Sequence, residues 1–421
     1  MINKNNVKNS ILLSLGYIKS FLFWTVLSLI VGAVSGVIGG AFAKSISCVT
    51  DLREQNGWLL FLLPFVGILS VFIYKLCRVS DIGTNQVFRA VQSENKVPFL
   101  LAPAVFIGSV FTHLCGGSAG KEGAALQLGG SIAALLSKIF HLKENQRHIL
   151  TLCGMAGLFS AVFGTPLGAA VFALEVVRVG HIYSVALFPT LISSLTAFGV
   201  SSRLGISAER FDSGTVSQYG LSIWWKVLLI SVAGALVSII FCRILHISEK
   251  LFKRYIKNAY FRIFAGGIII IVLTLILNTT DYNGGGIHII ERIFAEGAVR
   301  PEAFLLKIIF TAVTVGAGFK GGEIVPTMFI GATLGGSMAL LLGISPALGA
   351  AIGLSALFCG VTNCPLATLF LCMEMFGTNG ILFIAVSTFV SFMLSGYCGL
   401  YTGQKLIFSK LDEAVIDRYT E

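Results

Sequence analysis

Two glutamates stand in glycine-rich sequence with almost no other charge, one in each half of the chain. Glu122 lies in GGSAGKEGAALQLGG (116–130), and Glu323 lies in GFKGGEIVPTMFIGATLGG (318–336). An ionisable side chain at membrane depth is costly, so each of these acids is a functional-site hypothesis by default. Because the two settings are alike, we expect one site that is built from two related half-proteins.

The elements around these acids are apolar helices. Of the 421 residues 55% are hydrophobic and 12% are charged, and that charged share is about half of what soluble domains carry. Stretches long enough to span a bilayer recur, for example 21–43, 58–77, 222–242 and 381–400. They do not alternate apolar and polar residues as barrel strands do. We predict an all-α, polytopic membrane protein.

An internal repeat relates the two halves. The segment 154–175 (GMAGLFSAVFGTPLGAAVFALE) aligns without gaps to 353–374 (GLSALFCGVTNCPLATLFLCME). The shared positions include Pro166 with Pro365 and Glu175 with Glu374. The halves therefore run over about 20–200 and 222–402. Glu175 and Glu374 are expected to be structural, pairing with backbone donors or with a basic residue such as Arg178.

Pro166 and Pro365 each interrupt an apolar stretch, so each is expected to end one helix and begin another. Repeats with interrupted helices are typical of transporters, in which half-helix N-termini meet near the bilayer midplane. Free N–H groups and partial positive charge make such N-termini suitable for an anion. The alternative is that the 47 glycines serve close helix packing alone, in a duplicated fold without a shared site.

Three glycine-containing segments are candidates to surround that anion: 83–87 (GTNQV), 119–128 (AGKEGAALQL) and 321–326 (GGEIVP). The candidate anion-binding residues in them are Gly83, Thr84, Asn85, Gly120, Gly123, Gly322, Glu323, Ile324 and Val325. GAGFKG (316–321) matches a dinucleotide-binding pattern, but no strand–helix–strand unit surrounds it. GGSAGK (116–121) lacks the first glycine of a phosphate-binding loop, because position 115 is a cysteine.

Other chemistry is not indicated. The nine cysteines form no CxxC pair, and the six histidines form no cluster with metal-ligand spacing. We expect no metal and no cofactor. No nucleophile–base pair is visible, so an enzyme is not expected. The net charge of +10 is spread over many short loops, which argues against a nucleic-acid partner.

Basic residues flank the first and last apolar runs. Lys4, Lys8 and Lys19 precede residue 21, and Lys405 and Arg418 follow residue 400. Basic flanks favour the cytoplasm. We expect a cytoplasmic N-terminal segment (1–19), a transmembrane domain (20–405) and a short cytoplasmic tail (406–421), in a multi-pass protein of the cell membrane.

These segments resemble the CLC family of anion channels and proton-coupled anion transporters. AGKEGAALQLGG is similar to the family's GREGP-type segment, and GFKGGEIVPTMFIGATLGG is similar to its G-x-F-x-P segment. SGYCGLYTGQ (395–404) resembles the segment with the central tyrosine, here Tyr401, and DIGTNQVF (81–88) stands where the family has GSGIP. The resemblance covers about 20–405. It implies two inverted-topology repeats of broken and tilted helices, and a homodimer with one anion path per subunit.

Departures from the family pattern are informative. Thr84 replaces the serine that contacts chloride in typical members, and Glu323 replaces an apolar residue. Val176 stands where chloride–proton exchangers often carry an internal proton-transfer glutamate. These changes are similar to the fluoride-exporting subgroup, although Val325 takes a position at which many of its members have threonine.

The resemblance implies proton-coupled fluoride export, a fluoride/proton antiport. Fluoride is tightly hydrated, so its site must offer strong donors, such as helix N-termini and a protonated glutamate. An ionised Glu122 would imitate the anion, and its protonation would let it leave. Glu122 would then gate the path and carry the proton, and Glu323 would be a central donor and second proton stop. Tyr401 would close the inner side.

Each residue has a structural alternative. Glu122 and Glu323 would cap helix starts, Thr84 and Asn85 would be ordinary N-cap residues, and Tyr401 would belong to an interfacial belt. Lys121 and Lys320 would attract anions or lie as snorkelling loop lysines. The alternative function is chloride/proton antiport, or passive conduction of fluoride or chloride, on the same scaffold.

Overall fold

The computed structural model describes residues 4–79, 83–92, 97–214, 220–412 and 414–420, with the backbone alone for 4–13. The first half contains α1 (Lys4–Gln55), η1 (Gly57–Leu62), α2 (Leu63–Leu76), α3 (Thr84–Gln92), α4 (Leu101–Leu114), α5 (Glu122–Ile139), α6 (Glu144–Phe163), α7 (Pro166–Glu175), β1 (Arg178–Val179), η2 (Ser184–Ala186) and α8 (Leu187–Arg203).

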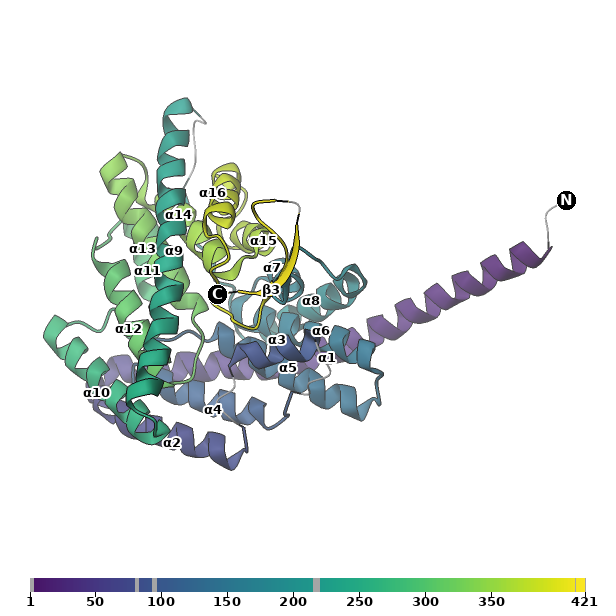
Figure 1. Ribbon diagram of the computed structural model, residues 1–421, viewed down its shortest axis with the longest axis horizontal. Coiled ribbons are helices and arrows are strands. Elements are labelled where there is room, and N and C mark those ends of the chain that lie inside the picture. The colour runs from purple at the N-terminus through teal and green to yellow at the C-terminus, as the bar shows by residue number, and fades with distance from the viewer. Residues whose placement is uncertain (1–3, 80–82, 93–96, 215–219, 413, 421) are drawn as a thin grey trace.

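The second half repeats the helical order and ends in two strands. It contains α9 (Leu221–Tyr255), α10 (Ala259–Leu277), α11 (Ile287–Glu296), α12 (Ala303–Ala317), α13 (Ile324–Leu342), α14 (Pro346–Thr362), α15 (Pro365–Phe376), α16 (Ile381–Leu394), β2 (Lys405–Phe408) and β3 (Val415–Tyr419). Residues 4–19 of the expected N-terminal segment belong to α1, whose first part projects away from the other helices (Figure 1).

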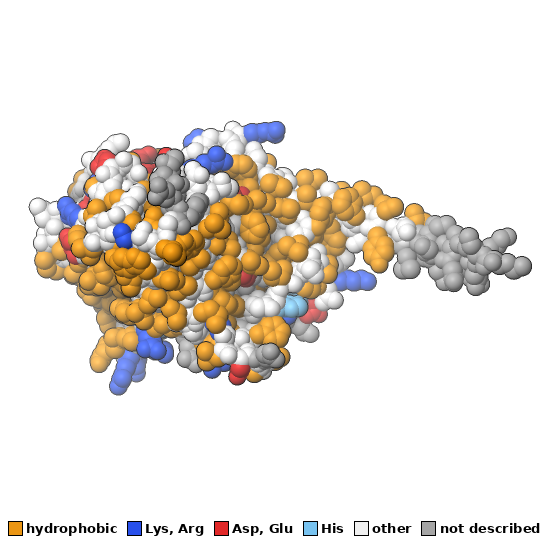
Figure 2. Space-filling model, turned by 90° about the horizontal axis from the view of Figure 1, so that it is seen from above, with side chains coloured by type: hydrophobic (Ala, Val, Ile, Leu, Met, Phe, Trp, Pro, Cys, Tyr) orange, Lys and Arg blue, Asp and Glu red, His pale blue; other side chains and the backbone are white. Residues whose placement is uncertain are grey.

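The surface and helix lengths fit a bilayer. Among the described residues, six helical segments are long and apolar enough to cross it: Ser14–Gln55, Gly57–Leu76, Ser184–Arg203, Leu221–Tyr255, Ala259–Leu277 and Ile324–Leu342. Hydrophobic side chains cover much of the face shown in Figure 2, and Lys and Arg lie mostly at its margins. The protein is an integral, multi-pass membrane protein, as its sequence predicted.

The packing of the two halves is matched pair by pair. The contact of α5 with α6 recurs as α13 with α14, that of α1 with α8 as α9 with α16, and that of α2 with α4 as α10 with α12. Glycines allow the closest of these contacts. A Cβ on Gly129 would overlap the carbonyl of Gly154, and one on Gly335 would overlap that of Gly349. These glycines therefore serve close helix packing, as the alternative interpretation expected. Such packing is compatible with a shared site elsewhere in the same fold.

Both prolines divide helices as expected. α6 ends before Gly164, which is left-handed (φ 76°), and α7 begins at Pro166. α14 ends before Asn363, also left-handed (φ 56°), and α15 begins at Pro365. A left-handed residue ends a helix and satisfies its last carbonyls, and proline begins the next one without losing a needed N–H.

The repeat glutamates connect the halves across this break. The Glu374 carboxylate accepts the amides of Leu167 (2.9 Å) and Gly168 (2.8 Å) at the start of α7. The Glu175 carboxylate accepts those of Leu366 (3.3 Å) and Ala367 (2.8 Å) at the start of α15. Both glutamates are therefore structural, as predicted, and their partners are backbone donors of the opposite half.

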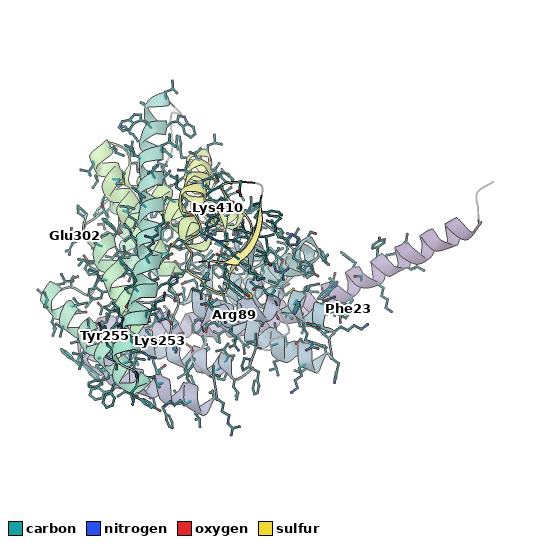
Figure 3. All side chains as sticks on the ribbon, viewed as in Figure 1. Phe23, Arg89, Lys253, Tyr255, Glu302 and Lys410 are labelled. Atoms are coloured by element: carbon teal, nitrogen blue, oxygen red, sulfur yellow. The ribbon has the colours of Figure 1, made fainter. Side chains whose placement is uncertain are left out.

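A three-stranded sheet includes the last two strands of the chain, and the sequence did not predict it. β1 pairs in parallel with β2, which places Arg178 opposite Lys405, and β2 pairs antiparallel with β3. Lys410, labelled in Figure 3, donates to Asn363 Oδ1 and to the carbonyl of Phe392 (2.7 Å). The residues of the expected tail thus bind the chain to both halves of the membrane domain.

Candidate functional site

The loops before α5 and α13 pair with each other. Gly120 and Gly322 exchange two backbone hydrogen bonds of 2.6 Å in an isolated antiparallel bridge. A Cβ on Gly123 would lie 2.7 Å from Gly322 Cα, so this crossing requires glycine. The sequence-predicted residues Gly120, Gly123 and Gly322 therefore bring two helix N-termini together, one from each half.

Glu122 is sealed on one side of this bridge. It is the first residue of α5 and is fully buried, and neither carboxyl oxygen has a hydrogen-bond partner among the described residues. Its Oε2 lies 2.6 Å from where a Cβ on Gly120 would be. No N–H group of the described helix start meets hydrogen-bond geometry with the carboxyl, although the amides of Lys121 and Glu122 lie near it. A buried carboxyl without a partner requires an explanation in function or in an occupant of the site.

Lys121, which precedes Glu122 in the chain, forms an ion pair with the loop residue Glu209. Lys121 Nζ lies 3.0 Å from Glu209 Oε1, and both side chains are largely buried. Lys121 therefore forms an ion pair, which was not among the two roles expected for it.

Glu323, unlike Glu122, lines a cavity. It is the N-cap residue of α13 without a side-chain cap bond, and a Cβ on Gly123 would lie 3.6 Å from its Oε2. The cavity has a volume of about 540 Å³ and also contacts Gly83, Thr84, Asn85 and Tyr401. Five of the predicted residues, taken from three separate segments, therefore line one space.

Thr84 and Asn85 connect the start of α3 to other segments. Gln127 Nε2 donates to Thr84 Oγ1 at 3.2 Å, and Gly403 N donates to Asn85 Oδ1 at 2.8 Å. Residues 80–82 lie outside the described part, so the structure does not describe the start of the expected segment 81–88.

Tyr401 is not an interfacial belt residue. It is 3% exposed, and its ring packs edge-to-face on Phe88 with centroids 5.0 Å apart. Its hydroxyl has no partner among the described residues. A buried phenol without a partner beside a polar cavity is suited to donate to a bound ion.

Ile324 and Val325 are predicted residues that do not reach the cavity. Both are buried in the first turn of α13, and a Cβ on Gly285 would lie 3.2 Å from Val325 Cγ1. Lys307 holds this glycine loop in place by donating to the carbonyls of Tyr282 (3.0 Å) and Gly284 (2.7 Å). The sequence signal for Lys307 was its place inside an apolar run, and it was missed.

Gln127 is a second missed residue. It lines the cavity and joins α5 to Thr84. It lies four residues after Gly123, so one helical turn places both on the same face. Charged residues lie further out along the cavity, including Arg89 on α3 and Lys253 on α9, both labelled in Figure 3. Glu249 pairs with Lys253 at 2.5 Å.

Broken helices from two inverted halves, meeting at a buried carboxyl beside a polar cavity, define a membrane transport protein. The sequence matches the family model described as voltage gated chloride channel over residues 66–396. The chain therefore belongs to that family, the CLC family, which confirms the resemblance that its motifs indicated.

Several relatives are similar over most of their length. A "Chloride/fluoride channel protein" of Pseudomonas syringae pv. tomato is 35% identical over 92% of this chain and 87% of its own. An "H(+)/Cl(-) exchange transporter ClcA" of Vibrio cholerae is 26% identical over 83% and 81%. A crystal structure of a CLC-type fluoride/proton antiporter superposes with a TM-score of 0.89 at 32% identity, over 92% of this chain and 98% of that chain.

Proposed function

We propose that this protein exports fluoride across the cell membrane in exchange for protons, and that it acts as a transporter and not as an enzyme. The observation that carries the proposal is the pair of carboxyls beside the Gly120–Gly322 bridge, one from each half. Glu122 is sealed and unpartnered, and Glu323 faces the cavity. The names of two relatives that are over 30% identical support fluoride as the anion.

The mechanism follows from the position of Glu122. In this mechanism the ionised carboxylate of Glu122 takes the place of an anion at the start of α5, where the partial positive charge of the helix N-terminus favours it. A proton from outside neutralises Glu122 and releases it from that place. Fluoride then enters from the cavity, and the proton leaves inward with the return of Glu122.

Glu323 and Tyr401 supply hydrogen-bond donors in place of the water molecules that fluoride loses when it enters the site. A protonated Glu323 offers an O–H donor at the end of the cavity, and the unpartnered Tyr401 hydroxyl offers another. Chloride is larger and more weakly hydrated, so it gains less from such strong donors. Selectivity for fluoride therefore resides at Glu323.

Both termini lie in the cytoplasm under this proposal, and the cavity opens to the cytoplasmic side. Two copies form a homodimer with one path each, which rests on family membership. Cross-linking in lipid tests the dimer, and recovery of monomers alone would count against it.

Proton recording with a variant tests the role of Glu122. We expect Glu122→Gln to abolish fluoride-driven proton movement in proteoliposomes, because the amide cannot release a proton. Glu291→Gln is the matched control, because Glu291 is exposed on α11. Unchanged proton movement in Glu122→Gln would remove this residue from the mechanism.

A further inference from the structure

A second cavity lies between the end of α5 and the start of α6. Its volume is about 630 Å³, and it shares no lining residue with the cavity of Glu323. We call it the α5–α6 pocket. One wall is apolar and includes Phe99 and Leu135, which are 54% and 39% exposed. Exposed large apolar side chains at the edge of a membrane domain lie against acyl chains.

The other wall of the α5–α6 pocket is basic. Lys138 and Arg147 line it together with His141 and His148, and Glu144 is the one carboxylate among the described lining residues. Arg147 Nε donates to the carbonyl of Leu142 at 3.0 Å, which fixes the guanidinium and leaves its terminal nitrogens as donors. Such a planar group binds a phosphate through two parallel hydrogen bonds.

The pocket lies at the end of the molecule that carries the C-terminal strands. His148 also lines a smaller cavity that contains Arg178, and Arg178 pairs with Lys405 between β1 and β2. Gln92 of α3 donates to the carbonyls of Val177 (2.8 Å) and Gly403 (3.0 Å) at the same end. This is the end that we assign to the cytoplasm, where the leaflet is rich in anionic lipid.

We propose that the α5–α6 pocket binds an anionic phospholipid of the cytoplasmic leaflet. The head-group phosphate lies against Arg147 and Lys138, and an acyl chain lies along Phe99 and Leu135. Basic pockets between transmembrane helices on the cytoplasmic side bind such head groups. The apolar wall favours a lipid over a soluble anion, because only a lipid has an acyl chain to place against it. The pocket also contacts Ala90 of α3, the helix that begins at Thr84.

Native mass spectrometry of the whole protein tests this directly. Purified protein is mixed with phosphatidylglycerol or with phosphatidylcholine of the same acyl chains. We expect wild-type protein to retain phosphatidylglycerol at least about tenfold better, since tenfold corresponds to 1.4 kcal/mol. The double variant Lys138→Ala, Arg147→Ala is expected to retain the two lipids equally. Lys143→Ala is the matched control and keeps the preference, because Lys143 is exposed and does not line the pocket.

Further variants keep the test decisive if the double variant does not fold. Arg147→Lys retains the charge and is expected to keep most of the preference, whereas Arg147→Gln loses it. Millimolar inorganic phosphate distinguishes a lipid from a soluble anion, because the acyl chain holds the lipid in the pocket. Equal retention of both lipids by wild-type protein, or full displacement of phosphatidylglycerol by phosphate, would overturn the proposal. Neither outcome bears on fluoride transport, so the two proposals fail separately.

Discussion

Glu122 and Glu323 occupy equivalent places in the repeat but differ in their surroundings. Glu122 is fully buried without a hydrogen-bond partner among the described residues, whereas Glu323 borders an open cavity of about 540 Å³. In the proposed mechanism the sealed carboxyl gates the path, because only protonation lets it move. The carboxyl on the cavity wall would meet the anion directly. The proposal therefore assigns two roles to the same residue type.

Substitution of Glu323 separates these roles. Glu323→Ala removes a donor to the anion, and we expect fluoride turnover to fall by about 10- to 100-fold, as the loss of a hydrogen bond to a charged group predicts. Glu323→Gln keeps an N–H donor and is expected to lose less. Fluoride efflux from proteoliposomes measures both. Equal losses in the two variants would contradict a donor role for this side chain.

Lys410 predicts a dependence of stability on pH. Burial lowers the pKa of this tail lysine from 10.5 to about 8. Between these values the unfolded chain binds more protons than the folded one, so folding stability rises with pH over this window and then levels off. We expect the melting temperature of wild type to rise relative to that of Lys410→Met from pH 8 to 10.5, because the variant lacks the titrating group. A difference that stays constant would show that Lys410 does not titrate in this window.

At the scale of elements, short helices are fixed by partners from the other half. α7 and α15 each begin with proline and each present free amides to a glutamate of the opposite repeat. A charged acceptor at a helix N-terminus satisfies those amides and favours the helix dipole. Contacts between the two repeats therefore stabilise the helix break in each membrane segment.

Loss of one of these contacts is expected to destabilise the protein. Glu374→Gln leaves a weaker, neutral acceptor for Leu167 N and Gly168 N, and we expect a loss of about 1–3 kcal/mol. Thermal unfolding in detergent measures it, with Glu291→Gln again as the exposed control. A melting temperature equal to that of wild type would mean that the reciprocal contacts do not stabilise α7.

The glycine bridge is expected to tolerate no side chain. A Cβ on Gly322 would overlap the amide nitrogen of Gly123, so Gly322→Ala must separate α5 from α13. We expect fluoride efflux to be lost. Gly199→Ala is the control, because a Cβ there meets nothing within 4 Å. Efflux at the wild-type rate in Gly322→Ala would show that the bridge can open without cost.

At the scale of the whole molecule, two related halves enclose one path. Hydropathy and the repeat at 154–175 and 353–374 were enough to predict the membrane helices and the proline breaks, because these are local patterns. The same patterns drew attention to Glu122 and Glu323, whose functional roles stay predictions. The sequence did not reveal which amides Glu175 and Glu374 accept, nor the pairing of Arg178 with Lys405. Those contacts join residues far apart in the chain, so no local periodicity encodes them.

The most direct measurement of the central claim is anion efflux from proteoliposomes with simultaneous proton recording. The wild-type protein is reconstituted into vesicles that are loaded either with fluoride or with chloride. The proposed site predicts fast fluoride efflux, with proton entry coupled to it and much slower chloride efflux. Chloride efflux as fast as that of fluoride, or fluoride efflux without proton movement, would contradict fluoride/proton exchange.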